Sequence, residues 1–473
     1  MYMTLLVVNL LIYIVVLAWY ARQPCASAFH PATFYAAVHG FVFVIRPIFA
    51  WIGQYQSIYI LYRFMPTMNE KMTVITIAIL AYVVVMATLV KLAPQRMIFV
   101  SVPDDIRDRM KAPVLIASAT LGMIALYSIL RNVNAAAEGI TTMKVTANGY
   151  KINTSGNGYL SDAQQMLVPI TLMIAWAYRF RFLSLVPFLL FVVLKSSGGG
   201  RGPFMIAAAT MALLYLYENK RSWPTPRILG LAVVLLMLFV SIGQDRGYAI
   251  RSLFFDEPPR VVNLKSKEHD FFDGMDFANM EYVEFLVHTV PKRTGTYNYF
   301  ADNLQVFTEP VPRVLWPGKP VGPPIQFYNL WDYGNPWGLT ISVVGQGWQG
   351  LGWLGVVIYA FLTGAFLAAI YRFAVRRIVS PFVLIGYLTF LGGTILYLRD
   401  GALLTVLRSE LFYLAPVIMS YAIAPDVRLR LNLFRRIGAK SYATALEQAR
   451  KLARTPNRNI ARGGRRQAVS HSK

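Results

Sequence analysis

The sequence predicts an all-α membrane protein that crosses the bilayer many times. Of its 473 residues, 56% are hydrophobic and only 15% are charged, whereas soluble domains carry about 25% charged residues. The mean hydropathy is +0.46, and most apolar residues lie in runs long enough to span a hydrocarbon core. One long stretch, residues 244–340, is polar instead and interrupts this pattern.

The apolar runs predict about eleven transmembrane helices, because a helix needs about 20 mainly apolar residues to cross the hydrocarbon core. The sixth and seventh runs are short for a complete crossing. The expected spans are 3–20, 32–53, 72–92, 112–131, 163–178, 182–195, 203–217, 227–243, 350–371, 378–398 and 402–424.

The distribution of Lys and Arg predicts how these helices are oriented. Basic residues concentrate in every second connection, after spans one, three, five, seven and nine, and the tail after span eleven contains thirteen. Cytoplasmic connections carry such an excess, so we expect the N-terminus outside and the C-terminus in the cytoplasm. The net charge of +23 is then explained by membrane orientation, and binding to nucleic acid is not expected.

Two further features narrow the class of protein. The one cysteine, Cys25, excludes an intramolecular disulfide framework and a cysteine metal cluster. The segment from Met3 to Tyr20 lacks a basic start and an obvious cleavage site, so we expect a first membrane span and not a cleaved signal peptide.

The chain divides into four parts. Residues 1–243 contain spans one to eight, 244–340 form a large and partly helical outward loop, 341–424 contain spans nine to eleven, and 425–473 form a basic tail. The loop carries nine Lys/Arg against twelve Asp/Glu, which fits an outward position away from any ATP pool. The tail starts as a helix and then becomes polar; it contacts anionic lipid headgroups or is simply solvated.

Several arginines lie at one depth, near the outer headgroup level. Arg46 is in the outer half of span two, Arg399 precedes span eleven, and Arg408 is in its outer half. Because the planar guanidinium suits phosphate oxygens, the group predicts a site for a lipid-linked phosphate or diphosphate. The alternative is internal pairing, of Arg408 with Glu410 or of Arg399 with Asp400.

A glycine-rich turn, Ser196 to Pro203, joins spans six and seven on the outer face and contains Arg201. Glycines allow backbone N–H groups to approach an anion, and the following helix N-terminus attracts negative charge. The turn is therefore a second candidate anion site. It is not a nucleotide-binding P-loop, since no Gly-Lys-Ser/Thr follows. A tight connection between two spans would also need glycine.

Within the polar loop, Phe277 to Val290 predicts an amphipathic helix. Glu281, Glu284 and His288 fall at i, i+3 and i+7 and therefore share one face. A carboxylate beside an imidazole can form a general base. A two-ligand metal site is a weaker alternative, because the pattern lacks the His-Glu-x-x-His spacing of metalloproteases. The alternative is a solvated helix face.

Four segments together resemble the Wzy-type O-antigen and exopolysaccharide polymerases, which join oligosaccharide repeat units. The resemblance covers most of the chain by topology but only about twenty residues by motif. Where that family often carries an acidic residue, this chain has Gln346. The four segments are His39 with Arg46-Pro47, the turn Gly199 to Gly202, Pro312-Arg313 with Trp316-Pro317 and Lys319-Pro320, and Ser342 through Gly352 to Gly355.

The resemblance implies a reaction and a place. Such enzymes work at the periplasmic face of the bacterial inner membrane, where they transfer a growing glycan from undecaprenyl diphosphate to the sugar end of a new lipid-linked unit. No metal or nucleotide cofactor is implied, and a flippase and a chain-length regulator of the same pathway are possible partners. Arg201, Arg313 and Lys319 would hold the diphosphate, with Arg46, Arg399 and Arg408 as second choices.

In this scheme His288, assisted by Glu284 or Glu281, would take the proton from the acceptor hydroxyl. Three alternatives remain open. One is a related enzyme, either an O-antigen ligase or a transferase that uses polyprenyl-phosphate sugars. Another is a transporter or flippase for lipid-linked sugars, although no internal repeat is evident. The third is a scaffold without catalytic activity.

Overall fold

The computed structural model describes residues 1–137, 143–145, 151–153, 158–197, 201–232, 234, 252, 278–311, 315–320, 322–335 and 340–436. Arg313, a predicted diphosphate contact, lies outside these ranges. The described chain is almost entirely helical, as expected. Its two three-residue strands, β1 (Met143–Val145) and β2 (Lys151–Asn153), pair antiparallel with Lys144 opposite Ile152.

The helices before the polar loop follow the predicted spans with longer or shorter ends. The first group is α1 (Tyr2–Ala21), α2 (Pro31–His39), the π-helical η1 (Gly40–Ile45), α3 (Arg46–Ile52), α4 (Ser57–Tyr62), α5 (Met68–Leu92) and α6 (Asp104–Ala137). The second group is α7 (Gly158–Asp162), η2 (Ala163–Met166), α8 (Leu167–Ala177), α9 (Phe182–Ser197) and α10 (Arg201–Glu218).

The polar loop contributes short helices, and the long helices resume after it. The loop elements are α13 (Asn279–Thr289), η5 (Ala301–Leu304), α14 (Gln305–Thr308) and η6 (Leu330–Tyr333). They are followed by α15 (Ser342–Arg377), α16 (Pro381–Asp400) and α17 (Leu403–Ala422). A further helix covers 425–436, so the predicted helical start of the tail is confirmed.

Seven helices in the described part of the chain are long and apolar enough to cross a membrane: Tyr2–Ala21, Pro31–Ile52, Met68–Leu92, Asp104–Asn134, Ser342–Arg377, Pro381–Asp400 and Leu403–Ala422. These helices identify a multi-pass membrane protein. α9 and α10 are apolar but shorter, and of the predicted span 227–243 only residues 227–232 and 234 are described.

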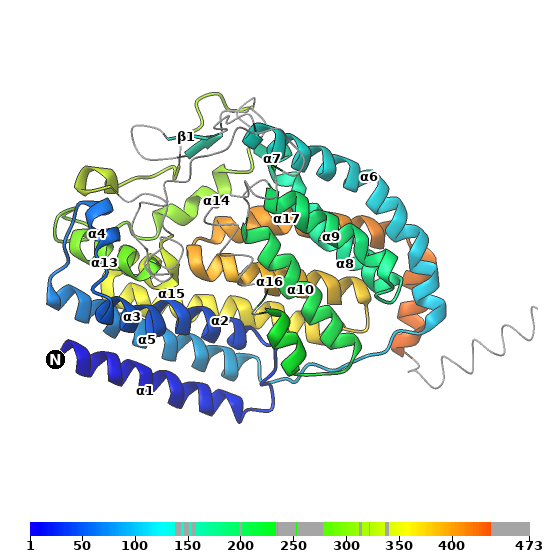
Figure 1. Ribbon diagram of the computed structural model, residues 1–473, viewed down its shortest axis with the longest axis horizontal. Helices are drawn as coiled ribbons and strands as arrows, with labels where there is room; N and C mark the ends of the chain where they lie inside the picture. The colour runs from blue at the N-terminus through cyan, green and yellow to red at the C-terminus, as the bar shows by residue number, and fades with distance from the viewer. Residues whose placement is uncertain are drawn as a thin grey trace, which may run out of the picture.

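The long helices pack side by side in a bundle (Figure 1). α15 packs against α5, and α16 lies against both α17 and α10. α15 approaches α5 closely at Gly364, where a Cβ atom would come within 2.8 Å of the Thr88 Cβ atom. Near its start α15 is interrupted at Leu351 and Gly352, and Gly352 has a φ of +60°, which glycine adopts without strain. α4 and α13 lie at the end of the bundle where α1 begins (Figure 1).

The second predicted span is one continuous helix with a wide π-helical turn in its middle. In that turn the Arg46 N–H bonds to the Phe41 carbonyl, one residue further back than in an α-helix. Pro47 has no N–H to offer the Phe43 carbonyl. The Asn9 side chain of α1 donates to that carbonyl instead, at 2.7 Å. The irregular turn and its outside partner therefore fix the position of Arg46.

Candidate functional site

Helix α13 is the central element of the polar end of the bundle, and it is held at both termini. At its start the Asn279 amide donates to the Thr340 carbonyl at 2.9 Å and to the Arg399 carbonyl at 3.2 Å. At its end the Trp348 indole of α15 donates to the Val290 carbonyl at 2.9 Å. Gly345 allows the close approach of α15, since a Cβ there would lie 3.0 Å from Leu286. A helix held in this way positions its side chains precisely enough for chemistry.

The predicted helix is confirmed, but the alternative of a solvated face is wrong. Every residue from Asn279 to Thr289 is buried except His288, which is half-buried. The acidic side chains of Glu281 and Glu284 therefore lie inside the protein. A buried carboxyl group requires a cation or strong hydrogen bonds, and the two glutamates meet this requirement differently.

Glu281 is paired with Arg46 of the second span. Arg46 Nε and Nη2 both donate to the same oxygen, Glu281 Oε1, at 2.9 and 2.6 Å. The Arg46 and Glu281 side chains are 0% and 4% exposed, and the guanidinium also lies 4.9 Å from the centre of the Tyr55 ring. Among the described residues, Arg46 Nη1 and Glu281 Oε2 have no hydrogen-bond partner. The pair thus keeps one donor and one acceptor unused.

Within the described part of the chain, no cation is bonded to Glu284. The Tyr59 hydroxyl of α4 donates to Glu284 Oε2 at 2.6 Å, while Oε1 has no partner within the described part of the chain. Burial, and then the neighbouring charge of Glu281, raise the pKa of Glu284 to about 8. This carboxyl group can accept and return a proton near neutral pH, which a carboxyl group of ordinary pKa does poorly.

A small pocket opens beside these groups. Its volume is about 80 Å³, enough for two or three waters at roughly 30 Å³ each. Glu281 and Tyr59 line it together with Lys71, whose ammonium lies 4.7 Å from the centre of the Tyr59 ring. Exposed residues of the α3–α4 connection, Gln54 and Gln56, form its rim. A hydroxyl group or a water can therefore reach Glu281 from outside, and Glu284 is bonded to Tyr59 of the pocket wall.

His288 has a carboxylate partner, but a different one from that predicted. Its Nδ1 atom lies 3.2 Å from Glu70 Oε2, not beside Glu281 or Glu284. Glu70 also accepts from Lys292 at 3.0 Å and caps the first turn of α5 together with Thr67. The prediction was wrong on the partner because the helix turns His288 toward the start of α5, while Glu281 and Glu284 are already bonded to Arg46 and Tyr59.

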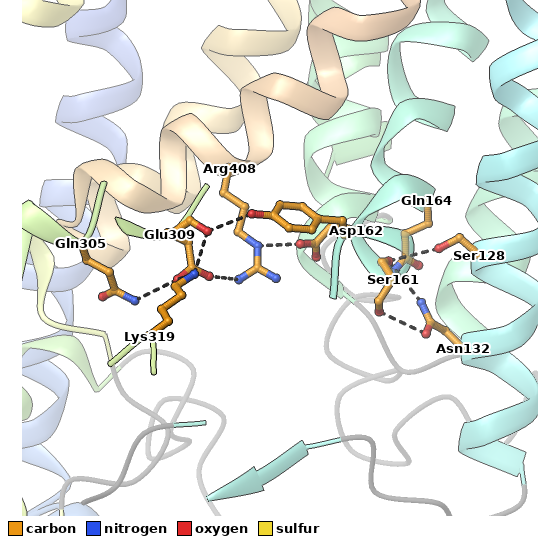
Figure 2. Close-up of polar contacts among 10 residues, drawn as sticks. Ser128, Asn132, Ser161, Asp162, Gln164, Gln305, Glu309, Lys319 and Arg408 are labelled. Atoms are coloured by element: carbon orange, nitrogen blue, oxygen red, sulfur yellow. Dashed lines mark hydrogen bonds and ion pairs between the residues drawn. The ribbon is translucent and has the colours of Figure 1, made fainter. Parts of the chain in front are cut away.

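Arg408 belongs to a second polar cluster at the same end of the bundle (Figure 2). Its Nε atom donates to Asp162 at 2.5 Å, and its Nη1 atom lies 3.8 Å from Glu309. Glu309 also pairs with Lys319 at 3.4 Å. The suggested Arg408–Glu410 pair is not formed. Arg408 and Lys319 therefore contact carboxylates of the connections, and a diphosphate would have to displace them.

The remaining predicted cations have different positions. Arg399 ends α16 and is partly buried; its Nε atom lacks a hydrogen-bond partner among the described residues, and the suggested pair with Asp400 is not formed. The backbone of Arg201 begins α10, but its side chain lies outside the described atoms, as does all of Arg313. Of the predicted diphosphate contacts whose side chains are described, Arg399 alone has no carboxylate partner.

Four contributing residues escaped prediction from the sequence. Tyr59, Asp162 and Glu309 lie in connections whose folding the sequence pattern does not specify. Glu70 had a local signal, because Thr67-x-x-Glu70 is a capping box before an apolar run. That signal predicts a helix start and not a contact with His288.

Comparison with known proteins leaves this geometry as the main guide to function. No protein-family model, no curated protein and no solved structure matches the chain.

Proposed function

We propose that the chain is a polysaccharide polymerase that joins undecaprenyl-diphosphate-linked oligosaccharide repeat units at the periplasmic face of a bacterial inner membrane. In this proposal all eleven spans cross the membrane, the N-terminus is outside, and residues 244–340 are periplasmic. The alternation of basic connections supports the orientation. The motif around Lys319-Pro320 and the pair Arg46-Pro47 support the family.

One observation carries the proposal: Glu281, which lines the small pocket, and the neighbouring Arg46 and Glu284 each keep a buried polar atom without a partner in the described chain. Buried polar groups are almost always hydrogen-bonded, so the free atoms of Arg46, Glu281 and Glu284 indicate a place where a substrate group bonds. The two carboxyl groups also differ in environment, since one is paired with a guanidinium and the other is not. Such unequal pairs are typical of acid–base sites.

The proposed reaction is a single displacement. The hydroxyl oxygen at the sugar end of the new unit bonds to the anomeric carbon of the growing glycan. The bond from that carbon to the diphosphate oxygen breaks, and its electron pair leaves with undecaprenyl diphosphate. The hydroxyl proton passes to Glu284. We assign this role to Glu284 instead of His288 because Glu284 is bonded to Tyr59, which lines the pocket, and keeps one oxygen without a partner in the described chain.

Cations must stabilise the charge that develops on the departing diphosphate. Arg399 is suited to this role because its side chain is not already paired with a carboxylate. Arg201 and Arg313 remain proposed contacts from their sequence motifs. Arg46 acts differently in this proposal: it holds Glu281 in place and leaves Nη1 to bond the acceptor sugar.

Glycan analysis of a deletion strain tests the assignment. Loss of a polymerase leaves glycans capped with a single repeat unit. Accumulation of full-length lipid-linked polymer would contradict the proposal and indicate a ligase. Loss of all lipid-linked units from the periplasmic face would indicate a flippase.

A purified system gives the direct test. The full-length protein in lipid vesicles, supplied with lipid-linked repeat units and no ion gradient, is expected to produce longer lipid-linked glycans. The matched control is the Glu284→Gln variant, which keeps the shape of the side chain. Equal elongation by both proteins would contradict the role of Glu284, and no elongation by either would contradict the proposed reaction.

A further inference from the structure

A long apolar groove lies at the other end of the bundle, away from the α13 site. It has a volume of about 910 Å³ and runs between α15, α16 and α17, and helix 425–436 closes one end. Its walls are mainly aliphatic and aromatic side chains, among them Phe366, Phe373, Phe390, Leu414 and Ile418. The volume falls in the range of ligand-binding cavities, roughly 300–1,000 Å³.

The length of the groove matches one membrane leaflet. Among the described residues that line it, Glu410 is the single acidic one. From Glu410 to Tyr421 the helix α17 rises about 16 Å, at 1.5 Å per residue. The hydrocarbon core of a bilayer is about 30 Å thick, so one leaflet is about 15 Å deep. The apolar part of the groove therefore accommodates a lipid tail of ordinary length.

Three arginines surround the end of the groove beyond Tyr421. They are Arg377 at the end of α15, and Arg428 and Arg435 on helix 425–436. Arg428 and Arg435 are seven residues apart and so share a helix face. Within the described chain, none of the three has a carboxylate within 4.0 Å. The guanidinium of Arg377 lies over Phe373 and that of Arg428 over Tyr421, so their charge is held at the groove.

Two neighbouring arginines that do not line the groove are paired with carboxylates. Arg430 of the same helix pairs with Asp105 at 2.9 Å, and Arg109 of α6 lies 3.7 Å from Asp426. Asp105 and Asp426 thus pair with arginines outside the groove lining. The three groove arginines keep their charge where an apolar tail would meet its headgroup.

We propose that this groove binds an anionic phospholipid, with its phosphate on Arg377, Arg428 and Arg435 and an acyl chain between α15, α16 and α17. Guanidinium groups bond phosphate oxygens with paired N–H donors. The chain's own tail is a poor occupant, since residues 437–473 carry nine Lys/Arg and one Asp/Glu. The proposal requires only the membrane location and is independent of the proposed reaction.

A polyprenyl diphosphate is also a poor occupant of this groove. In the proposed reaction its diphosphate lies at the outward end, near Arg399, whereas the cations of the groove lie at the opposite end of α17. The lipid at this site would instead be a tightly held component of the membrane that stabilises the packing of helix 425–436 on the bundle.

The test compares thermal stability of the full-length protein in neutral phosphatidylcholine micelles, titrated with phosphatidylglycerol. Wild type is expected to gain several degrees in Tm, at saturation. The Arg428→Gln and Arg435→Gln variants should each need about fivefold more phosphatidylglycerol to reach half of the gain in Tm. This follows because one basic residue contributes about 1 kcal/mol to the attraction of anionic lipid. Ala369→Trp, which fills the groove without changing charge, should abolish the gain. Arg436→Gln, on the same helix but outside the groove, is the matched control and should behave as wild type.

Each other outcome overturns the proposal. Equal gains in all variants would indicate general attraction to the basic tail. The same gain from inorganic phosphate would remove the need for an acyl chain, and a gain from polyprenyl phosphate but not from phosphatidylglycerol would identify a different occupant. A variant could be less stable than wild type before any lipid is added. In that case mass spectrometry measures the phosphatidylglycerol that purified wild type and Arg436→Gln retain. If neither protein retains this lipid, the proposed site does not exist.

Discussion

Two polar clusters use similar groups but differ in how completely those groups are bonded. At α13, Arg46 meets Glu281 in full burial, and Glu284 lies nearby without a bonded cation. At the second cluster, Arg408 is 41% exposed and is shared by Asp162 and Glu309. The first cluster keeps unbonded polar atoms beside a pocket, whereas in the second the cations are matched by carboxylates. Under the proposed function, the comparison places the chemistry at the first cluster and attachment of the connections at the second.

The largest expected effect is on the rate of elongation. Glu284→Gln should lower the rate by about 10²–10⁴-fold, the usual contribution of a positioned acid or base. Asp162→Asn in the second cluster should lower it less than tenfold. The measurement is glycan elongation by purified protein in vesicles, at protein concentrations matched by size-exclusion chromatography. A larger loss in Asp162→Asn than in Glu284→Gln would reverse the comparison.

The next effect is on stability. Arg46→Ala leaves Glu281 buried without its cation, which should lower the free energy of unfolding by roughly 3–5 kcal/mol. The double variant Arg46→Met with Glu281→Leu replaces both partners by apolar groups and should recover most of that loss. Denaturant titration in detergent measures both. If the double variant is as unstable as Arg46→Ala, the pair is not the cause of the loss.

The pH dependence of the rate sharpens the assignment within the first cluster. Because the pKa of Glu284 is raised to about 8, its base form increases as the pH rises toward 8. The rate at pH 6 should therefore be about one hundredth of the plateau reached well above pH 8. Elongation measured from pH 5.5 to 9 tests this. A midpoint near 6.5, the ordinary value of an imidazole, would point to a histidine instead.

The smallest effect concerns the second cluster. Arg408→Gln removes a partly exposed ion pair, so the free energy of unfolding should fall by no more than about 1 kcal/mol. The connection that contains Glu309 and Lys319 should exchange its amide hydrogens faster, because one of its attachments is lost. Hydrogen exchange with peptide resolution measures this. Unchanged exchange in residues 305–320 would show that Arg408 does not hold this segment.

The predictions from sequence were accurate where a signal is local. The helix of Glu281 and Glu284 was predicted within two residues at each end, since its apolar spacing is a property of neighbouring positions. Contacts between distant positions were not predicted. Arg46 and Glu281 are 235 residues apart, and the carboxylate beside His288 comes from the capping residue of α5.

The sequence by itself determined that this is a helical multi-pass membrane protein, because hydrophobic length and charge patterning follow directly from residue order. It also proposed Arg46 as a candidate because charged groups within a membrane require a reason, and Glu281 and Glu284 because they share a helix face with His288. Only the tertiary structure decided how they are used. Burial and the choice of partner depend on which helices meet, so pairing Arg46 with Glu281 and leaving Glu284 with Tyr59 is a result of packing.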